Sequence, residues 1–172
     1  MDLGISGKTA LVSASSAGLG FASALALAES GCKTVISGRN EERLMHAANK
    51  IPNSIPVIAD VSTVKGSQAL VQDAKSQLGT NIDILITNAG GPPAGTFAST
   101  DVDQYLTAIE LNLMSVVAMC KETVPDMQEK KWGRVLAITS ISVRQPIPNI
   151  MLSNTARAGV TGFLKTMALE TA

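Results

Sequence analysis

Residues 9–20 read TALVSASSAGLG, and the rest of the chain is organised around this stretch. Its first four residues are apolar or β-branched, which is typical of a buried strand. Small residues fill positions 13–18, and from residue 21 apolar side chains recur at helical spacing until Gly31. A strand, a small-residue turn and a helix in this order form a cradle for a dinucleotide, because the backbone can approach a pyrophosphate and the helix N-terminus offers free N–H groups.

The turn has fewer glycines than the usual dinucleotide fingerprint, which carries three. Only Gly18 and Gly20 are present. Taken alone, the stretch is therefore consistent with either a dinucleotide cradle or a plain strand–turn–helix unit. The remainder of the chain distinguishes the two.

The composition favours one domain over residues 1–172 with an aliphatic core. Hydrophobic residues make up 45% of the chain and aromatic residues 3%. Such a core suits a parallel sheet that is covered by helices on both faces. Fourteen basic and fourteen acidic residues cancel, so charge gives no reason to expect a nucleic acid or an anionic membrane as a partner. No apolar run approaches the ~20 residues that span a bilayer.

The cysteines and the lone histidine indicate neither a disulfide framework nor a metal site. Cys32 and Cys120 lie far apart and outside any motif, as expected for buried thiols in a reducing cytoplasm. The N-terminus lacks the pattern of a signal peptide. His46 lies within a helical pattern without a cluster of other ligands, so we expect no bound metal.

Strands and helices are predicted in strict alternation along the chain. Strand patterns occupy residues 9–12, 33–37, 55–59, 82–87 and 134–140. Helical patterns run from 21 to 30, from a cap at Asn40 to about 50, from a cap at Ser62 or Thr63 to about 78, from about 99–101 to about 123, and from about 153 onward. Pro125 is expected to kink the fourth helix or to start a new one.

This alternation predicts a doubly wound parallel sheet in three layers, because long connecting helices permit right-handed crossovers. Ligands of such sheets bind beyond the carboxyl ends of the strands. We therefore expect the residues at or just after strand ends to meet in one crevice: Gly18, Arg39, Asp60, Asn88 and Ser140.

Arg39 indicates which dinucleotide the crevice accepts. An acidic residue at the end of the second strand would bind the ribose 2′-OH of NAD, whereas an arginine there suits the 2′-phosphate of NADP. We expect NADP rather than NAD. The alternative is an ordinary solvated loop arginine.

With these residues in view, the chain resembles the short-chain dehydrogenase/reductase family over its whole length, closest in style to bacterial 3-oxoacyl-carrier-protein reductases. The resemblance rests on the 13–20 turn, Asp60-Val61, Asn88-Ala89-Gly90, Asn112 and Ser140, in the family's order. It implies a Rossmann-like fold and hydride transfer between NADP(H) and a small carbonyl or secondary alcohol. It also implies cofactor contacts from Ser13, Ser15, Ser16, Gly18, Leu19, Gly20, Arg39, Asp60, Val61, Asn88, Ala89 and Gly90.

The family's catalytic Tyr and Lys are replaced. Aligning SNTARAGV with the family's YSASKAAV places Ser153 at the Tyr and Arg157 at the Lys. The resemblance implies that Ser140 bonds the substrate oxygen, that Asn112 holds a water of the proton relay, and that Arg157 holds the ribose. The single tyrosine, Tyr105, is expected to lie far from the crevice.

These replacements predict slow or altered chemistry, because a serine hydroxyl is a far weaker acid than a phenol and an arginine does not lose its proton. Arg144 is a candidate electrophile or anion clamp. A second hypothesis is a cofactor-binding protein with little or no turnover, in which Ser153 is only the N-cap of the last helix. A nucleotide-binding fold that serves another reaction, such as methyl transfer, is a third hypothesis, which the Asn88, Asn112 and Ser140 motifs disfavour.

The resemblance also implies that further strands and a substrate-binding segment follow in relatives, so we expect a chain that is incomplete at its C-terminus. One sheet edge would then be bare. The family's usual assembly implies a homo-oligomer formed through the long helix and the last helix. The sequence does not identify the substrate.

Overall fold

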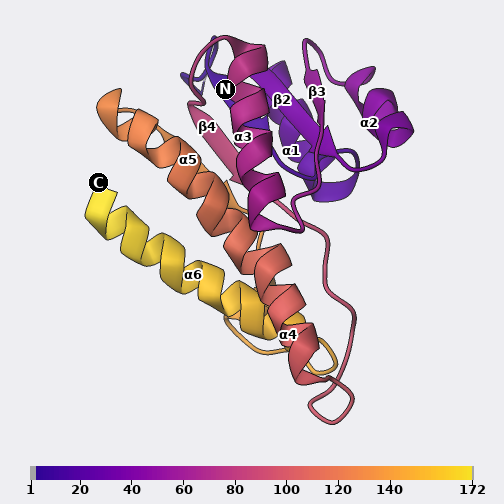
Figure 1. Cartoon of the computed structure of the whole chain (residues 1–172). Helices are drawn as coiled ribbons and strands as arrows, with labels where there is room; N and C mark the ends of the chain where they lie inside the picture. Colours follow the sequence, from indigo (N-terminus) through magenta and orange to yellow (C-terminus); the bar gives the residue numbers. More distant parts are fainter. Residues whose placement is uncertain (1–2, 172) are drawn as a thin grey trace.

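Five parallel strands form the central sheet of the computed structural model, which describes residues 3–171 (Figure 1). Their spatial order is β3-β2-β1-β4-β5. Strands β2 and β3 are added on one side of β1, and β4 and β5 on its other side, so the topological switch point lies between β1 and β4. This confirms the predicted doubly wound parallel sheet. The strands are β1 (Thr9–Val12), β2 (Lys33–Gly38), β3 (Ile55–Ile58), β4 (Ile84–Thr87) and β5 (Arg134–Ala137).

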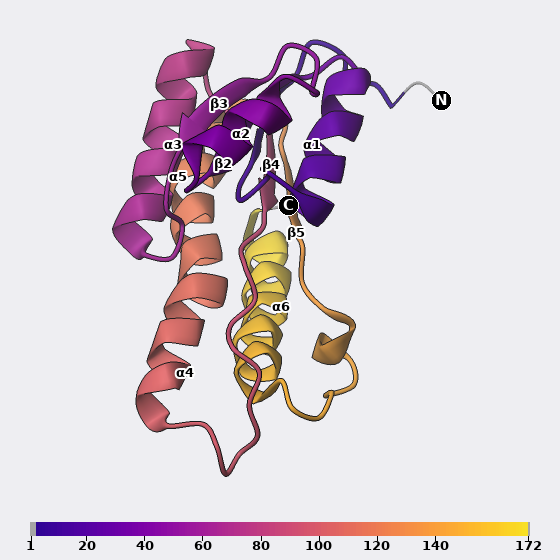
Figure 2. The same cartoon turned by 90° about the vertical axis from the view of Figure 1, so that its right-hand side faces the viewer.

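Helices cover both faces of the sheet (Figures 1 and 2). One face carries α1 (Gly18–Glu29) and α2 (Glu41–Ala48). The other carries α3 (Val64–Leu78), α5 (Ser115–Glu129) and α6 (Met151–Thr171). Helix α4 (Val102–Ile109) passes through the π-helical segment η1 (Glu110–Met114) directly into α5. Helix α4 and the start of α6 extend beyond the sheet.

Two apolar clusters lie on the two faces because successive side chains of a strand point in opposite directions. Ala10 and Val12 of β1 face α1, whereas Leu11 between them packs in the cluster with α3 and α5. All three are fully buried. Aliphatic side chains supply most of both clusters, as the composition predicts.

Local cap chemistry starts two helices where the sequence places them. The Asn40 side chain accepts a hydrogen bond from the Arg43 N–H, and the Thr63 hydroxyl accepts one from the Gly66 N–H. Of the two alternatives for the α3 cap, Thr63 is therefore correct. Helix α2 ends at Ala48, two residues before the predicted end.

Several predicted boundaries are wrong. Helix α1 begins at Gly18, three residues before the predicted start, and β4 begins at Ile84, two residues after it. Helix α5 does not end near residue 123 but continues to Glu129 with Pro125 inside it, and its buried face packs along α3. Strand β5 ends at Ala137 rather than residue 140, because its partner β4 ends at Thr87. The last helix begins at Met151, which places Ser153 inside the first turn and rules out Ser153 as its N-cap.

The edge strand β5 pairs only with β4 within residues 3–171. Its outward side chain Leu136 is 52% exposed. A bare edge on this side is what the sequence predicts. Within the same residues, no helix is long and apolar enough to cross a membrane, and no group of three or more His, Cys, Asp or Glu side chains is placed to hold a metal ion.

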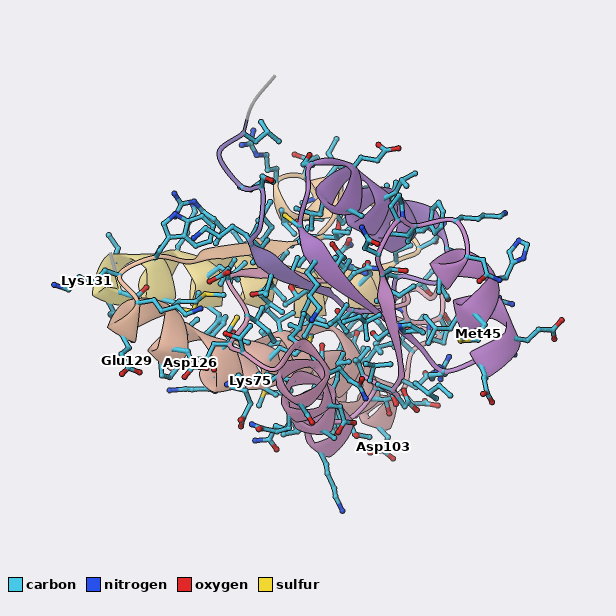
Figure 3. The ribbon with its side chains drawn as sticks, turned by 90° about the horizontal axis from the view of Figure 1, so that it is seen from above. Met45, Lys75, Asp103, Asp126, Glu129 and Lys131 are labelled. Carbon is cyan, nitrogen blue, oxygen red and sulfur yellow. The ribbon has the colours of Figure 1, made fainter. Side chains whose placement is uncertain are left out.

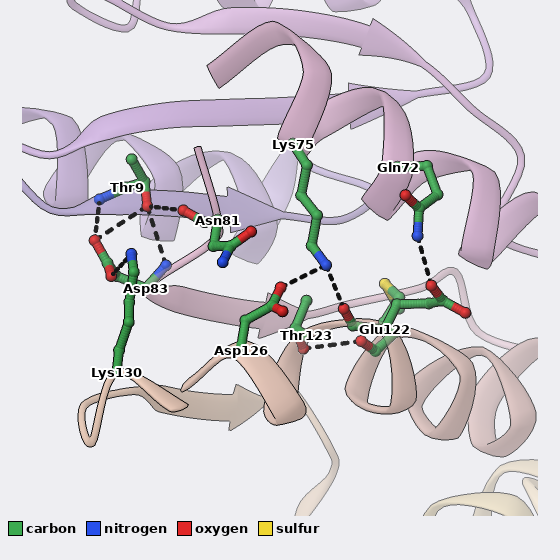
Figure 4. Close-up of polar contacts among 10 residues, drawn as sticks. Thr9, Gln72, Lys75, Asn81, Asp83, Glu122, Thr123, Asp126 and Lys130 are labelled. Atoms are coloured by element: carbon green, nitrogen blue, oxygen red, sulfur yellow. Dashed lines mark hydrogen bonds and ion pairs between the residues drawn. The ribbon is translucent and has the colours of Figure 1, made fainter. Parts of the chain in front are cut away.

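Polar contacts join α3 to α5 along one side of the molecule (Figures 3 and 4). Lys75 of α3 forms an ion pair with Asp126 of α5 at 2.6 Å and donates to the Glu122 carbonyl at 2.7 Å. Gln72 donates to the Glu122 carboxylate at 2.6 Å. These contacts fix α5, and hence the η1 segment that precedes it, against the sheet.

A buried carboxylate at the amino ends of the strands ties β1, β4 and α5 together (Figure 4). Asp83 accepts hydrogen bonds from the Thr9 N–H at 3.1 Å and from Lys130 at 3.0 Å. Burial alone would raise the pKa of the Asp83 carboxyl, but these hydrogen bonds and the Lys130 charge outweigh it and hold the pKa below 3.8. The ionised form is therefore the stabilising one.

We expect Asp83→Asn to lower the free energy of unfolding at pH 7 by about 1–3 kcal/mol, because it weakens charge-assisted hydrogen bonds. Since the folded-state pKa lies below the unfolded value of about 3.9, the stabilisation is complete above that value and is lost as the pH falls through the folded pKa. Urea denaturation of both proteins from pH 7 downward measures this. A difference that stays constant below about pH 4 would contradict the assignment.

Candidate active site

A crevice of about 650 Å³ opens beyond the carboxyl ends of the strands. Four of the five strand-end residues expected to meet there do line it, namely Gly18, Arg39, Asp60 and Asn88. Ser140 lies three residues beyond β5 and does not line this crevice. Of the other residues proposed as cofactor contacts, Ser16, Val61, Ala89 and Gly90 also line it.

Two serines of the turn after β1 hold the turn itself rather than face the crevice. Both are fully buried. The Ser13 hydroxyl donates to the Asn88 carbonyl at 2.7 Å and accepts from the Asn88 N–H at 2.8 Å. The Ser15 hydroxyl donates to the Val12 carbonyl at 2.7 Å and accepts from the Ser37 N–H at 2.9 Å. Ser13 and Ser15 are therefore positioning residues for the cradle.

The start of α1 is left open to an anion. Its N-cap, Ala17, has no side chain to bond the first N–H groups, and the first turn carries no acidic residue. Gly18 has φ +60° and Ala14 has φ +45°. Glycine adopts this left-handed region without strain, whereas Ala14 costs roughly 1–2 kcal/mol there. Ala14 replaces a glycine of the fingerprint and still adopts the left-handed backbone conformation at its position in the turn.

Gly20 packs against a hydrogen bond between the segments that follow the two central strands, β1 and β4. The Asn88 side chain donates to the Ala14 carbonyl at 2.9 Å. An added Cβ at Gly20 would lie 2.7 Å from both the Ala14 oxygen and the Asn88 Nδ2 atom. Only glycine fits here, so the structure gives Gly20 a role through close approach of the backbone. Leu19, between the two glycines, is 68% exposed.

The far end of the crevice carries both signs of charge. Arg39 Nε lies 4.0 Å from the Asp60 carboxylate, and both side chains are more than half exposed. A hydrogen bond from the Ser62 N–H lowers the pKa of the Asp60 carboxyl, to which the Arg39 charge adds. Asp60 is thereby held as an anion next to a loosely paired arginine.

Asn112 sits in the π-helical segment and is 3% exposed. Its Nδ2 atom donates to the Gly90 carbonyl at 2.9 Å, while its Oδ1 atom is buried and has no hydrogen-bond partner among the described residues. A π-turn changes the direction of a helical side chain by one residue and is frequent at functional sites. Here the hydrogen bond from the Asn112 side chain ties the long helix to the segment that follows β4.

Arg157 and Asn112 line the same small cavity, which also borders Asn88 and Ala89 of the main crevice. Arg157 Nη1 donates to the Ile138 carbonyl at 2.8 Å. Burial lowers the pKa of its guanidinium, yet an arginine keeps its proton in proteins. The structure thus places a cation and an amide oxygen together beside the crevice.

Ser140 and Ser153 line neither the main crevice nor this small cavity. Ser140 caps the 3₁₀ helix η2 (Ile141–Val143), where its hydroxyl accepts from the Ser142 N–H at 3.1 Å. Segment η2 packs against α6, which carries Ser153 one turn before Arg157. Residues four apart share a helix face. Tyr105 lies on α4, outside the linings of both cavities. Arg144 is exposed at the end of η2.

Several crevice residues were not found from the sequence. Asn40 and Arg43 line it beside Arg39, and Thr107 and Leu111 line it from α4 and η1. The signal for Arg43 is its place in the first turn of a helix that starts next to Arg39. For Thr107 and Leu111 the only signal is their spacing of four residues. Whether the helix face that they share reaches the crevice depends on how the helix packs.

The sequence model of the family described as short chain dehydrogenase matches residues 8–172. The human protein "Dehydrogenase/reductase SDR family member 4" is 29% identical over 173 residues, which cover 98% of this chain and 62% of that protein. The chain thus spans less than two thirds of the length of this curated relative.

Solved structures show the same likeness. L-sorbose reductase from Gluconobacter frateurii, complexed with NADPH and L-sorbose, superposes with a TM-score of 0.93 at 32% identity, covering 99% of this chain and 66% of that one. Actinorhodin polyketide ketoreductase with NADPH gives 0.89 at 27% identity, covering 96% and 65%. A 7α-hydroxysteroid dehydrogenase complexed with NADH gives 0.90 at 26% identity, covering 97% and 66%.

Proposed function

Since the chain belongs to the short-chain dehydrogenase family, we propose that it is an NADP-dependent oxidoreductase that transfers a hydride between the cofactor and a small carbonyl or secondary alcohol. The observation that carries the proposal is the crevice itself, which joins an uncapped helix N-terminus at one side to Arg39 at the other. A nicotinamide cofactor, when bound, supplies the hydride.

The residues present fit such a cofactor. The open N-terminus of α1 offers backbone N–H groups to a pyrophosphate. Asp60 and Val61 border the adenine end, and the segment from Asn88 to Gly90 borders the other. Both NADPH and NADH occur in complexes of the structural neighbours, so the preference for NADP rests on Arg39.

We expect Arg39→Gln to weaken NADPH binding about tenfold and to leave NADH binding unchanged, because charge-assisted contacts to a phosphate are worth about 1.5–3 kcal/mol before solvent screening. Fluorescence titration of the variant with each cofactor measures both affinities. An equal loss for NADPH and NADH would show that Arg39 acts on the fold of the crevice instead of the 2′-phosphate.

At the reacting end, Ser140 would bond the substrate oxygen, Asn112 would hold a water, and Arg157 would bind the ribose from beside the crevice; the cavity that Asn112 and Arg157 line measures about 10 Å³, which is room for about one water and not for a sugar. Arg157 supplies positive charge near a developing alkoxide but does not release a proton. Ser153 has a hydroxyl of low acidity in the place of the expected proton donor. The proposed activity is therefore slow unless another acid takes part.

A second candidate is a cofactor-binding protein without turnover. It is favoured by the Arg157–Ile138 hydrogen bond at 2.8 Å, which anchors the cation to the backbone at the end of β5. Oxidation of NADPH in the presence of small ketones, keto sugars and 3-oxoacyl thioesters separates the two. Saturable binding without oxidation of NADPH supports the second candidate.

Three further properties belong to the same proposal. Binding of the small-molecule substrate would occur next to the Arg144–Pro148 loop. The buried free thiols Cys32 and Cys120 suit a reducing cytoplasm; burial raises the pKa of the Cys120 thiol to about 12. Self-association would involve the faces of α4, α5 and α6 that lie away from the sheet (Figure 2). Equilibrium sedimentation of the chain tests the last point.

A further inference from the structure

We infer that Arg43, in the first turn of α2, is a second specificity-determining residue that binds the same 2′-phosphate as Arg39. The inference rests on the proposed function, because it concerns the phosphate that distinguishes NADP from NAD. It adds a residue that lies on a different element from Arg39 and that is fixed in place by a different interaction.

Arg39 and Arg43 are the only cations that line the crevice within residues 3–171, and the lining places them on either side of Asn40. Both side chains are exposed. Glu41 and Glu42 lie between them in the sequence but do not line the crevice. The two arginines thus face the crevice while the acidic side chains of the same turn do not.

The charge balance at this rim favours a contribution from the second arginine. Arg39 lies 4.0 Å from the Asp60 carboxylate, which is held ionised by the Ser62 N–H. Asp60 offsets part of the Arg39 charge, so Arg39 attracts a phosphate dianion less strongly than an unpaired arginine would. Arg43 makes no ion pair with any acidic side chain of residues 3–171. Its charge makes the rim positive.

The backbone of Arg43 is held in the position that this role needs. The Asn40 side-chain oxygen accepts from the Arg43 N–H at 2.8 Å and fixes the first turn of α2. Leu44, the next residue, is fully buried against the sheet. The Arg43 side chain therefore leaves a rigid site, and a planar guanidinium can bind two phosphate oxygens at once.

The test uses two nucleotides that lack the nicotinamide, so that catalysis plays no part. Isothermal titration calorimetry of the full chain compares adenosine 2′,5′-bisphosphate with 5′-AMP. We expect Arg43→Gln to weaken the bisphosphate about tenfold and to leave 5′-AMP unchanged. The matched control is Lys50→Gln, which removes an exposed cation near the other end of α2, outside the crevice lining. We expect it to alter neither affinity.

The outcomes separate this inference from the proposed function. If the unaltered chain prefers the bisphosphate and the Arg43→Gln variant keeps that preference, the inference is wrong and the NADP proposal stands. An equal loss for both nucleotides, or the same loss in the Lys50→Gln control, also overturns it. If the unaltered chain binds the two nucleotides equally, the NADP preference and the inference fail together.

Discussion

Replacing Ser153 by Tyr and Arg157 by Lys together is expected to raise the rate of carbonyl-dependent NADPH oxidation by at least about 10²-fold, because a positioned acid–base group contributes ~10²–10⁴-fold. The two positions lie one turn apart on the same face of α6, which packs against η2, and Arg157 lines the Asn112 cavity. A phenol can give up its proton near neutral pH when a cation lies beside it, whereas a serine hydroxyl does not.

The measurement is a steady-state assay of both proteins with the same panel of carbonyl compounds. The matched control adds Ser140→Ala to the double variant, which should remove most of the gain. Turnover at the original rate in a double variant that still binds NADPH would show that residues 153 and 157 do not limit the reaction. If the unaltered chain shows no measurable turnover and the double variant does, the result would support the cofactor-binding alternative for the natural sequence.

Gly20→Ala is expected to lower the free energy of unfolding by about 2–4 kcal/mol and to weaken NADPH binding at least tenfold. The added methyl group would lie 2.7 Å from the Ala14 oxygen and from Asn88 Nδ2. One of these groups must move, which breaks the hydrogen bond between the turn after β1 and the residue after β4. Both ends of the pyrophosphate cradle are then displaced.

Chemical denaturation and fluorescence titration test this, with Gly162→Ala as the matched control. Gly162 lies in α6 and an added Cβ there meets no atom within 4 Å. Alanine suits a helix interior better than glycine, so the control should be neutral or slightly stabilised. Unchanged stability and binding in the Gly20→Ala variant would mean that the cradle does not depend on this close approach.

The sequence was sufficient for the fold because each strand and helix carries its own local signal. The continuous apolar run in β1, the caps Asn40 and Thr63 and the turn glycines each act within a few residues. The parallel order then follows from long crossover helices. The crevice was predicted for the same reason, since strand ends of a parallel sheet share one edge.

The errors at the ends of β5 and α5 concern distant contacts. The end of β5 is set by where β4 stops, and the intact helix through Pro125 is set by packing on α3. The cofactor contacts of Ser13 and Ser15 stay a prediction, and the structure adds hydrogen bonds from their hydroxyls to the neighbouring strands, which no local pattern indicates. Arg43 was missed because its position at the crevice depends on the angle at which α2 leaves β2, and no local pattern records that angle.

The most direct test of the central claim is a fluorescence titration of the chain with NADPH and, separately, with NADH. The account predicts saturable binding of both, with NADPH at least about tenfold tighter because Arg39 faces its 2′-phosphate. Equal affinities would contradict the assignment of NADP, and the absence of saturable binding to either would contradict the cradle as a cofactor site.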